Sequence, residues 1–121
     1  MSRRDDLARL EDMLAAARTA AMAIEGRTVA DLHQDRIWTL GLLKSLEIIG
    51  EAAARVQPET RARSPQVPWS VIVATRNRVV HGYFEIDYEQ IWKALVEDLP
   101  PLIRQIEEAI EKERLLRGLS P

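Results

Sequence analysis

The sequence contains no cysteine and only two histidines, His33 and His81, among its 121 residues. The absence of cysteine excludes disulfide bonds and thiolate-ligated metal sites. A zinc site would need both histidines together with carboxylates, and the two histidines lie far apart in the sequence. Nothing in this pattern supports a metal site or a cofactor, so we expect the protein to work without one.

Long apolar runs are missing as well. No stretch approaches the roughly 18 consecutive apolar residues that a membrane-spanning helix requires. The first residues, Met-Ser-Arg-Arg-Asp-Asp, lack the apolar centre of a signal peptide. Together these absences lead us to expect a cytoplasmic protein that makes no membrane contact.

The net charge is small, with a formal value of −2, so the molecule as a whole has no attraction for nucleic acid. The charges are distributed unevenly, because five arginines between residues 55 and 78 face the single acid Glu59, whereas the chain after residue 85 is acid-rich. Such a cluster fits a site for a phosphate-bearing ligand, an interface with an acidic partner, or a solvated charged face. The arginines are Arg55, Arg61, Arg63, Arg76 and Arg78.

Convincing period-two alternation, the signal of a β-strand, is also absent. Apolar residues recur instead at steps of three and four over residues 2–24, which predicts one helix that Gly26 ends. A turn with a short helical lead-in is expected over 28–34. A second long helix over 35–56 carries a broad apolar arc, which indicates burial on more than one side.

Prolines divide the rest of the chain. Pro58, Pro65 and Pro68 favour a short helix or turn, followed by a helix over 68–84. Asp87 is placed to cap a further helix whose apolar face continues to residue 110, with a kink or a break-and-restart at the consecutive prolines 100 and 101. Residues 116–121 are expected to fray.

These elements predict the fold class. An apolar fraction of 46% and a charged fraction of 30% are typical of an ordinary globular protein. Short connections between helices favour antiparallel neighbours. We therefore expect a single all-α domain over residues 1–121, an antiparallel bundle of four long helices with one or two short ones.

The end of the 68–84 helix gathers side chains that handle anions and protons, namely Arg76, Asn77, Arg78, His81 and Tyr83. Asn77 and His81 are four apart and share a helix face. Arg76 and His81 are five apart, which places them about 140° apart around a straight helix. Either the last turn is distorted near the following glycine, or the site combines residues from two copies of the chain. We favour a two-fold homodimer.

The residue types in this cluster fit phosphoryl chemistry without a metal. A neutral histidine can take a proton from a ribose 2′-hydroxyl or give one to a leaving oxygen. An arginine holds a phosphate and stabilises developing charge, Asn77 could orient the histidine or a phosphate oxygen, and Tyr83 could stack on a base. The simpler alternative is that the histidine caps the helix and that aromatic residues such as Trp69 and Trp92 belong to the core.

The segment from Arg76 to Tyr83 reads Arg-x4-His-x-Tyr with an Arg-Asn start, and it resembles the signature of HepT-like proteins in the HEPN superfamily. The stretch Leu-Glu-Ile-Ile-Gly-Glu-Ala-Ala over 46–53, Val-Pro-Trp over 67–69 and Asp-Leu-Pro over 98–100 are also similar to family members. The resemblance covers nearly the whole chain.

The resemblance implies a helical HEPN bundle that forms a homodimer and acts as a toxin, with an MntA-like nucleotidyltransferase as its antitoxin. It further implies a metal-independent RNase in which Arg76 and His81 are the catalytic pair, and AMP transfer to Tyr83 as the step that neutralises it. Two alternatives remain open. One is a non-catalytic nucleotide-binding or nucleotidyl-acceptor protein, and the other is a plain helical dimerisation module.

Two glutamates on the 35–56 helix lie four residues apart and share a face, Glu47 and Glu51. They are either a solvated stripe or partners of the motif. If their helix packs beside the 68–84 helix, one of them could pair with Arg76 or Arg78 and preset the site. We expect His33 to be structural or exposed.

Overall fold

The computed structural model describes residues 3–81 and 87–118, without the side chains of residues 3, 4, 80 and 81. The regular elements are α1 (Arg3–Ala23), α2 (Val29–Gln34), α3 (Arg36–Arg55), α4 (Pro58–Arg63), α5 (Trp69–His81), α6 (Tyr88–Lys93), the π-helix η2 (Ala94–Asp98) and α7 (Leu99–Leu116). The predicted all-α fold is confirmed, because every regular element in these residues is helical. No helix in the described ranges is long and apolar enough to span a membrane.

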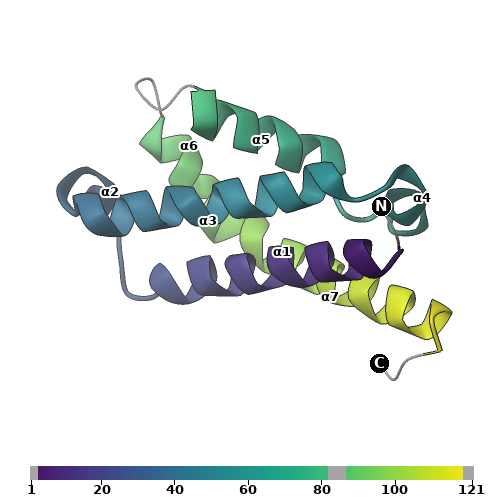
Figure 1. Cartoon of the computed structure of the whole chain (residues 1–121). Helices are drawn as coiled ribbons and strands as arrows, with labels where there is room; N and C mark the ends of the chain where they lie inside the picture. The colour runs from purple at the N-terminus through teal and green to yellow at the C-terminus, as the bar shows by residue number, and fades with distance from the viewer. Residues whose placement is uncertain (1–2, 82–86, 119–121) are drawn as a thin grey trace.

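Helix α3 occupies the middle of the bundle. It packs against α1 on one side and against α5 on the other, and both neighbours run antiparallel to it (Figure 1). Helix α7 crosses behind α1 and contacts it along much of its length. This central position explains the broad apolar arc of α3, since a helix covered on two sides must bury two faces.

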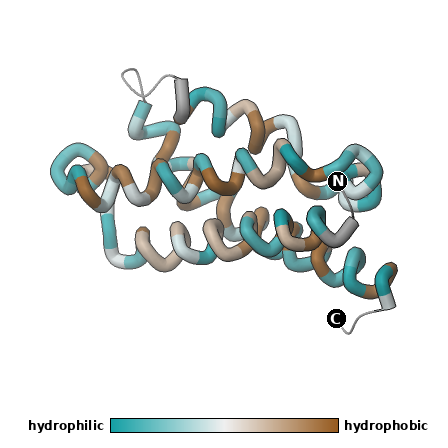
Figure 2. The backbone as a smooth tube through the Cα atoms, viewed as in Figure 1, coloured by the Kyte–Doolittle hydropathy of each residue, from teal (hydrophilic) through white to brown (hydrophobic). Residues whose placement is uncertain are grey.

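The core lies where α1, α3 and α7 meet. Leu10 and Met13 of α1, Ile49 of α3 and Ile106 of α7 are almost completely buried in one cluster. Figure 2 shows hydrophobic residues recurring along these helices between hydrophilic ones. Burying each such side chain contributes roughly 1.5–3 kcal/mol to folding, so this cluster dominates the stability of the bundle.

Most helix limits follow the sequence signals. α1 ends before Gly26, which has a φ of 71° that other residues rarely adopt. Asp35 caps α3, where its side chain accepts a hydrogen bond from the Trp38 N–H and another from Arg27. The Arg27 hydrogen bond, and then that of Trp38, lower the pKa of Asp35 below its ordinary value. The Asp87 cap is present, accepting from the N–H groups of residues 89 and 90.

The sequence predicts a kink or a break-and-restart at prolines 100 and 101, but the helix does not break there. Residues 88–116 are helical throughout, and the change occurs just before the prolines as the π-helix η2, in which the Leu99 N–H bonds to the Ala94 carbonyl. A proline ring collides with the carbonyl one turn earlier and has no N–H to offer it. The wider π turn accommodates this conflict without a break. It marks the boundary between α6 and α7 within one long helical stretch, so α1, α3, α5 and residues 88–116 are the four long helices and α2 and α4 the two short ones, as predicted.

A buried polar network joins α1, α4 and α7. Asp6 is fully buried and accepts hydrogen bonds from the Thr60 hydroxyl at 2.6 Å and from the Gln57 N–H at 3.2 Å. Arg63 donates to both oxygens of Glu113, at 2.7 and 2.9 Å, and to Thr60. Glu113 is 1% exposed, and its hydrogen bond with Arg63 is the main reason that the pKa of Arg63 is raised. The network therefore fixes the short helix α4 between two long ones.

We expect the substitution Glu113→Gln to lower the free energy of unfolding by about 1.5–3 kcal/mol, because it leaves the Arg63 guanidinium without its countercharge. Urea denaturation followed by circular dichroism measures the change. Glu107→Gln is the matched control, since Glu107 lies on the same helix and bonds Arg18 at 2.8 Å in an exposed pair. That control should change stability by less than about 0.5 kcal/mol. Equal effects of the two substitutions would contradict a structural role for the Arg63–Glu113 pair.

Candidate active site

Arg76 lies on the face of α5 that packs against α3. Ile72 and Val79 are buried on this face, four residues before Arg76 and three residues after it. That spacing places all three side chains on one stripe of the helix. Arg76 thus occupies a position in which the pattern of the helix would otherwise put an apolar residue, and its side chain is only 27% exposed.

Gly50 of α3 makes room for this arginine. A Cβ atom added at Gly50 would overlap the Arg76 Cβ and lie 2.5 Å from its Cγ. Only glycine permits this approach, because any side chain at position 50 would push the two helices apart. Gly41 on the same helix has nothing within 4 Å of the corresponding position, so the requirement for glycine is local to position 50.

Two polar contacts orient the Arg76 guanidinium. Its Nη2 donates to Glu51 Oε1 at 3.2 Å, and its Nη1 donates to Asn77 Oδ1 at 3.0 Å. Its Nε is buried and bonds no acceptor within the described residues. Because Glu51 is 40% exposed, the ion pair contributes little to stability, about 1 kcal/mol at most. The contacts fix the direction of the guanidinium and leave N–H groups over for a ligand.

The structure separates the two glutamates that the sequence paired. Glu51 makes the ion pair with Arg76, whereas Glu47 lies 3.6 Å from Lys44 of its own helix and not on Arg76 or Arg78. Of the two, Glu51 is the one that pairs with a motif arginine, as the hypothesis required of one of them. One helical turn separates these glutamates, and only the later one lies level with Arg76 on the neighbouring helix.

The remaining motif residues are placed to different degrees. Asn77 and Arg78 are exposed, and the Arg78 side chain makes no hydrogen bond or ion pair within the described part of the chain. His81 is the last residue of α5, and its side chain lies outside the described residues. The same is true of Tyr83 as a whole. Because α5 stays helical as far as His81, positions 76 and 81 are about 140° apart around the helix axis, as the sequence predicted.

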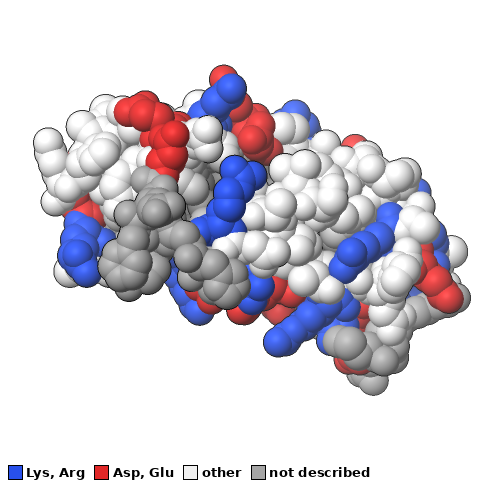
Figure 3. All heavy atoms as spheres, turned by 90° about the horizontal axis from the view of Figure 1, so that it is seen from above, with Lys and Arg blue, Asp and Glu red and all other residues white. Residues whose placement is uncertain are grey.

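The five arginines of the basic cluster do not form one phosphate site. Arg61 donates to the carbonyls of residues 53, 54 and 56 and so caps the end of α3. Arg63 is paired with Glu113. Figure 3 accordingly shows Lys and Arg side chains in separate groups, with uncharged surface between them. Sequence proximity overstated this cluster, because a folded chain directs neighbouring arginines to different tasks.

Trp69 and Trp92 pack against the core and His33 is exposed, as expected for these residues. Trp69 is partly buried and donates from Nε1 to the Ser64 carbonyl at 3.0 Å. Trp92 packs against Trp38 with ring centroids 6.4 Å apart. His33 is exposed, and its ring packs edge-on against the Tyr88 ring with the centroids 4.8 Å apart. In the described residues, no three His, Asp or Glu side chains form a group that could hold a metal ion.

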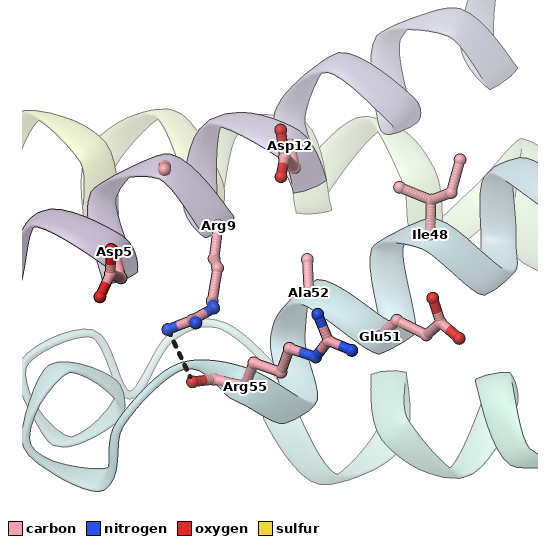
Figure 4. A pocket seen from close by; sticks show the side chains of 8 residues that line it. Asp5, Arg9, Asp12, Ile48, Glu51, Ala52 and Arg55 are labelled. Carbon is pink, nitrogen blue, oxygen red and sulfur yellow. Dashed lines mark hydrogen bonds between the residues drawn. The ribbon is translucent and has the colours of Figure 1, made fainter. Parts of the chain in front are cut away.

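A polar groove of about 310 Å³ lies between α1 and α3, and Glu51 forms part of its wall (Figure 4). Its charged lining residues are Asp5, Arg9, Asp12, Glu51 and Arg55. Arg9 donates to the Arg55 carbonyl at 3.3 Å, which links the two helices at this end. Glu51 therefore borders both the groove on one side of α3 and Arg76 on the other.

Sequence analysis missed Gly50 and Arg55 as residues of this region. Gly50 carried one usable signal, because a glycine within a helical pattern costs stability and often marks a close contact. Arg55 was named only as a member of the basic cluster, with no link to Glu51. Their relevance depends on which helix faces follow each other in space.

Comparison with known proteins supplies the family. Residues 5–109 match the protein family described as "Ribonuclease HepT-like". A protein of Caldanaerobacter subterraneus named "Putative RNase TTE0752" is 32% identical over 105 residues, which cover 87% of this chain and 94% of that protein. "Putative RNase MJ1380" of Methanocaldococcus jannaschii is 34% identical over 107 residues, covering 88% and 98%. "Probable ribonuclease HepT" of Thermococcus cleftensis is 32% identical over 72 residues, covering 60% and 66%. No solved structure matches the chain.

We expect Gly50→Ala to lower the free energy of unfolding by about 1–3 kcal/mol, because the added methyl group overlaps the Arg76 side chain and forces α3 and α5 apart. Urea denaturation measures this loss. Gly41→Ala is the control in the same helix, and there the better helix propensity of alanine should leave stability unchanged or raise it by up to about 1 kcal/mol. If both variants are equally stable, the contact at Gly50 is not the tight one described above.

Proposed function

The chain belongs to the ribonuclease HepT-like family, and from this membership we propose that it is an endoribonuclease that cleaves RNA without a metal ion. The observation that carries the proposal is the position of Arg76. It begins the Arg-x4-His-x-Tyr motif and lies on the packed face of α5. Glu51 and Asn77 orient its guanidinium, which keeps further N–H groups for a ligand. An arginine held in this way has its guanidinium already oriented when a phosphate arrives.

The reaction follows from the two motif residues. Arg76 donates to the non-bridging oxygens of the scissile phosphate and stabilises the negative charge that grows there. His81 acts as the acid–base group. The ribose 2′-oxygen loses its proton and bonds to phosphorus, while the bond from phosphorus to the 5′-oxygen breaks and that oxygen receives a proton. The products are a 2′,3′-cyclic phosphate and a free 5′-hydroxyl.

The proposed enzyme is a homodimer whose cleft combines residues of both copies. Helical spacing supports this arrangement, since α5 extends to His81 and two positions five residues apart lie about 140° apart around a regular helix. A two-fold axis close to α5 brings Arg76 of one copy toward His81 of the other. Asn77 and Arg78 are exposed on α5, and Arg78, three residues before His81, extends the basic surface on the His81 side of the cleft.

Purified protein should cleave single-stranded RNA at the same rate with and without EDTA. Arg76→Ala and His81→Ala should each slow cleavage about 100-fold or more, because one removes charge stabilisation and the other removes proton transfer. Gel analysis of labelled RNA measures the rates, and Arg104→Ala, an exposed arginine on α7, serves as the control. Activity that is unchanged in His81→Ala, or that requires a metal ion, rejects the proposal.

Mixing the two inactive variants tests the composite cleft. A mixed dimer of Arg76→Ala and His81→Ala chains keeps one intact site only if Arg76 and His81 come from different copies. Half of the dimers are mixed and each has one of two sites, so roughly a quarter of wild-type activity should return. No recovery, in chains shown to exchange subunits, would place both residues of a site on one copy.

We further propose that the chain is the toxin of a toxin–antitoxin pair, controlled by an MntA-like nucleotidyltransferase. In the transfer, the Tyr83 hydroxyl oxygen bonds to the α-phosphorus of ATP, pyrophosphate leaves, and the phenolic proton passes to solvent. Tyr83 follows His81 by two residues, so the added phosphate brings bulk and negative charge next to the catalytic pair. RNA is then repelled from the cleft. A purely non-catalytic acceptor would carry the same modification and lack the RNase activity.

Co-expression with such a nucleotidyltransferase should add AMP to the chain and abolish both RNA cleavage and growth arrest. The chain offers its own control, because it has only two tyrosines, Tyr83 and Tyr88. Tyr83→Phe should stay unmodified by mass spectrometry, whereas Tyr88→Phe should be modified as the wild type is. Modification that persists in Tyr83→Phe, or that leaves cleavage intact, contradicts this form of control.

A further inference from the structure

Glu51 has a second arginine within reach besides the one that it binds. We propose that Glu51 is a positioning residue that changes partner: it holds Arg76 in the free protein, and it moves to Arg55 when a phosphate takes its place on Arg76. This inference rests on the proposed RNA-binding function of Arg76 and concerns how that site is prepared and then released.

The side chain of Glu51 is partly exposed and can move. The side chain is 40% exposed, and its Oε1 accepts one hydrogen bond from Arg76 Nη2, at 3.2 Å. Its side chain also lines the polar groove on the α1 side of α3. A carboxylate with a single contact and open space on the other side can change its rotamer without disturbing the core.

Arg55 lies close to Glu51 on the same helix. It follows Glu51 by four residues on α3, and a glutamate four residues before a basic residue is the favourable order for an ion pair on a helix. Both side chains project into the same groove, where Figure 4 shows the Arg55 guanidinium beside the Glu51 side chain. Within the described residues, the Arg55 guanidinium makes no hydrogen bond or ion pair.

The other charged residues of the groove favour Arg55 as the new partner. Arg9 is the alternative cation, but its guanidinium already bonds Asp6 and the Arg55 carbonyl. Asp5 and Asp12 also line the groove from α1, and they make it unfavourable for a carboxylate that arrives without a cation. Arg55 supplies that cation on the same helix as Glu51, so the exchange needs no movement of the backbone.

The exchange is driven by the phosphate itself. A phosphate that binds Arg76 lies close to the Glu51 carboxylate, and two negative groups at this distance repel each other. When Glu51 turns to Arg55, the repulsion falls and the Nη2 donor of Arg76 becomes available to the phosphate. Glu51 thus orients Arg76 before binding and withdraws during binding, while Arg55 makes the withdrawal favourable without touching the RNA.

A double-mutant cycle on RNA binding tests the exchange. The probe is a fluorescent single-stranded RNA of about 12 nucleotides with 2′-O-methyl groups, which cannot be cleaved through the 2′-oxygen, and affinity is measured by anisotropy at low salt. Arg55→Gln should weaken binding about two- to five-fold in the wild-type background. In the Glu51→Gln background, Arg55→Gln should have no effect, because no displaced charge then needs a partner.

Any other result of the double-mutant cycle rejects the exchange of partners. Equal weakening in both backgrounds means that Arg55 binds the RNA directly. No weakening in the wild-type background means that Glu51 does not use Arg55. Asp12→Asn, which removes a carboxylate from the same groove, is the matched control, and it should not abolish the coupling between Glu51 and Arg55.

A second measurement requires no RNA and separates the exchange from the proposed function. In Arg76→Gln, Glu51 loses its partner, so the NMR signal of the Arg55 Nε–H should shift and its exchange with water should slow. The change should disappear in Arg76→Gln/Glu51→Gln. If the wild type fails to bind RNA but this change is seen, the RNase proposal fails and the change of partner stands. An Arg55 signal that is the same in all variants rejects the change of partner.

Discussion

The close approach of α3 and α5 at Gly50 is the contact on which the arrangement of the candidate site depends. It brings an arginine, and not an apolar residue, to the packed face of α5, because the missing side chain at Gly50 leaves room for the Arg76 stem. The neighbouring Glu51 then lies level with the guanidinium. A cationic side chain in a helix interface needs such a polar partner, since burial without one is costly. The missing side chain of Gly50 and the carboxylate of Glu51 therefore position the same group, the Arg76 guanidinium.

Charge is allocated differently in the two halves of the bundle. Where α4 meets the start of α1 and the last turns of α7, the buried acids are paired, as in the contacts of Asp6 and of the Arg63–Glu113 pair. These contacts hold a short helix that has too few apolar residues to hold itself. Along α5 and in the groove between α1 and α3, the charges are partly buried or exposed, with Arg78 and Arg55 making no hydrogen bond or ion pair in the described chain. The ligand-binding proposals concern this second region, where charges can still change partners.

Much of the fold was predictable because its signals are local. The periodic apolar residues, the glycine at position 26 and the cap at Asp87 each act within a few residues, and each lies where the sequence placed it. The two consecutive prolines were also recognised as a disturbance. Their outcome, a π turn without a break, was not predictable, because it depends on the packing that keeps the helix continuous on both sides of the prolines. The family signature, finally, was readable from residue types and spacing alone.

By itself, the sequence determined that this protein is helical, which residues form its motif, and to which family it belongs, because these properties depend on short-range spacing and residue identity. The tertiary structure decided which charged residues meet. It engaged Arg61 and Arg63 in caps and pairs, and it separated Glu51 from Glu47. It also gave Gly50 its role beside Arg76. The physical reason is that partners from different helices are selected by the relative rotation and height of those helices, which no local pattern encodes.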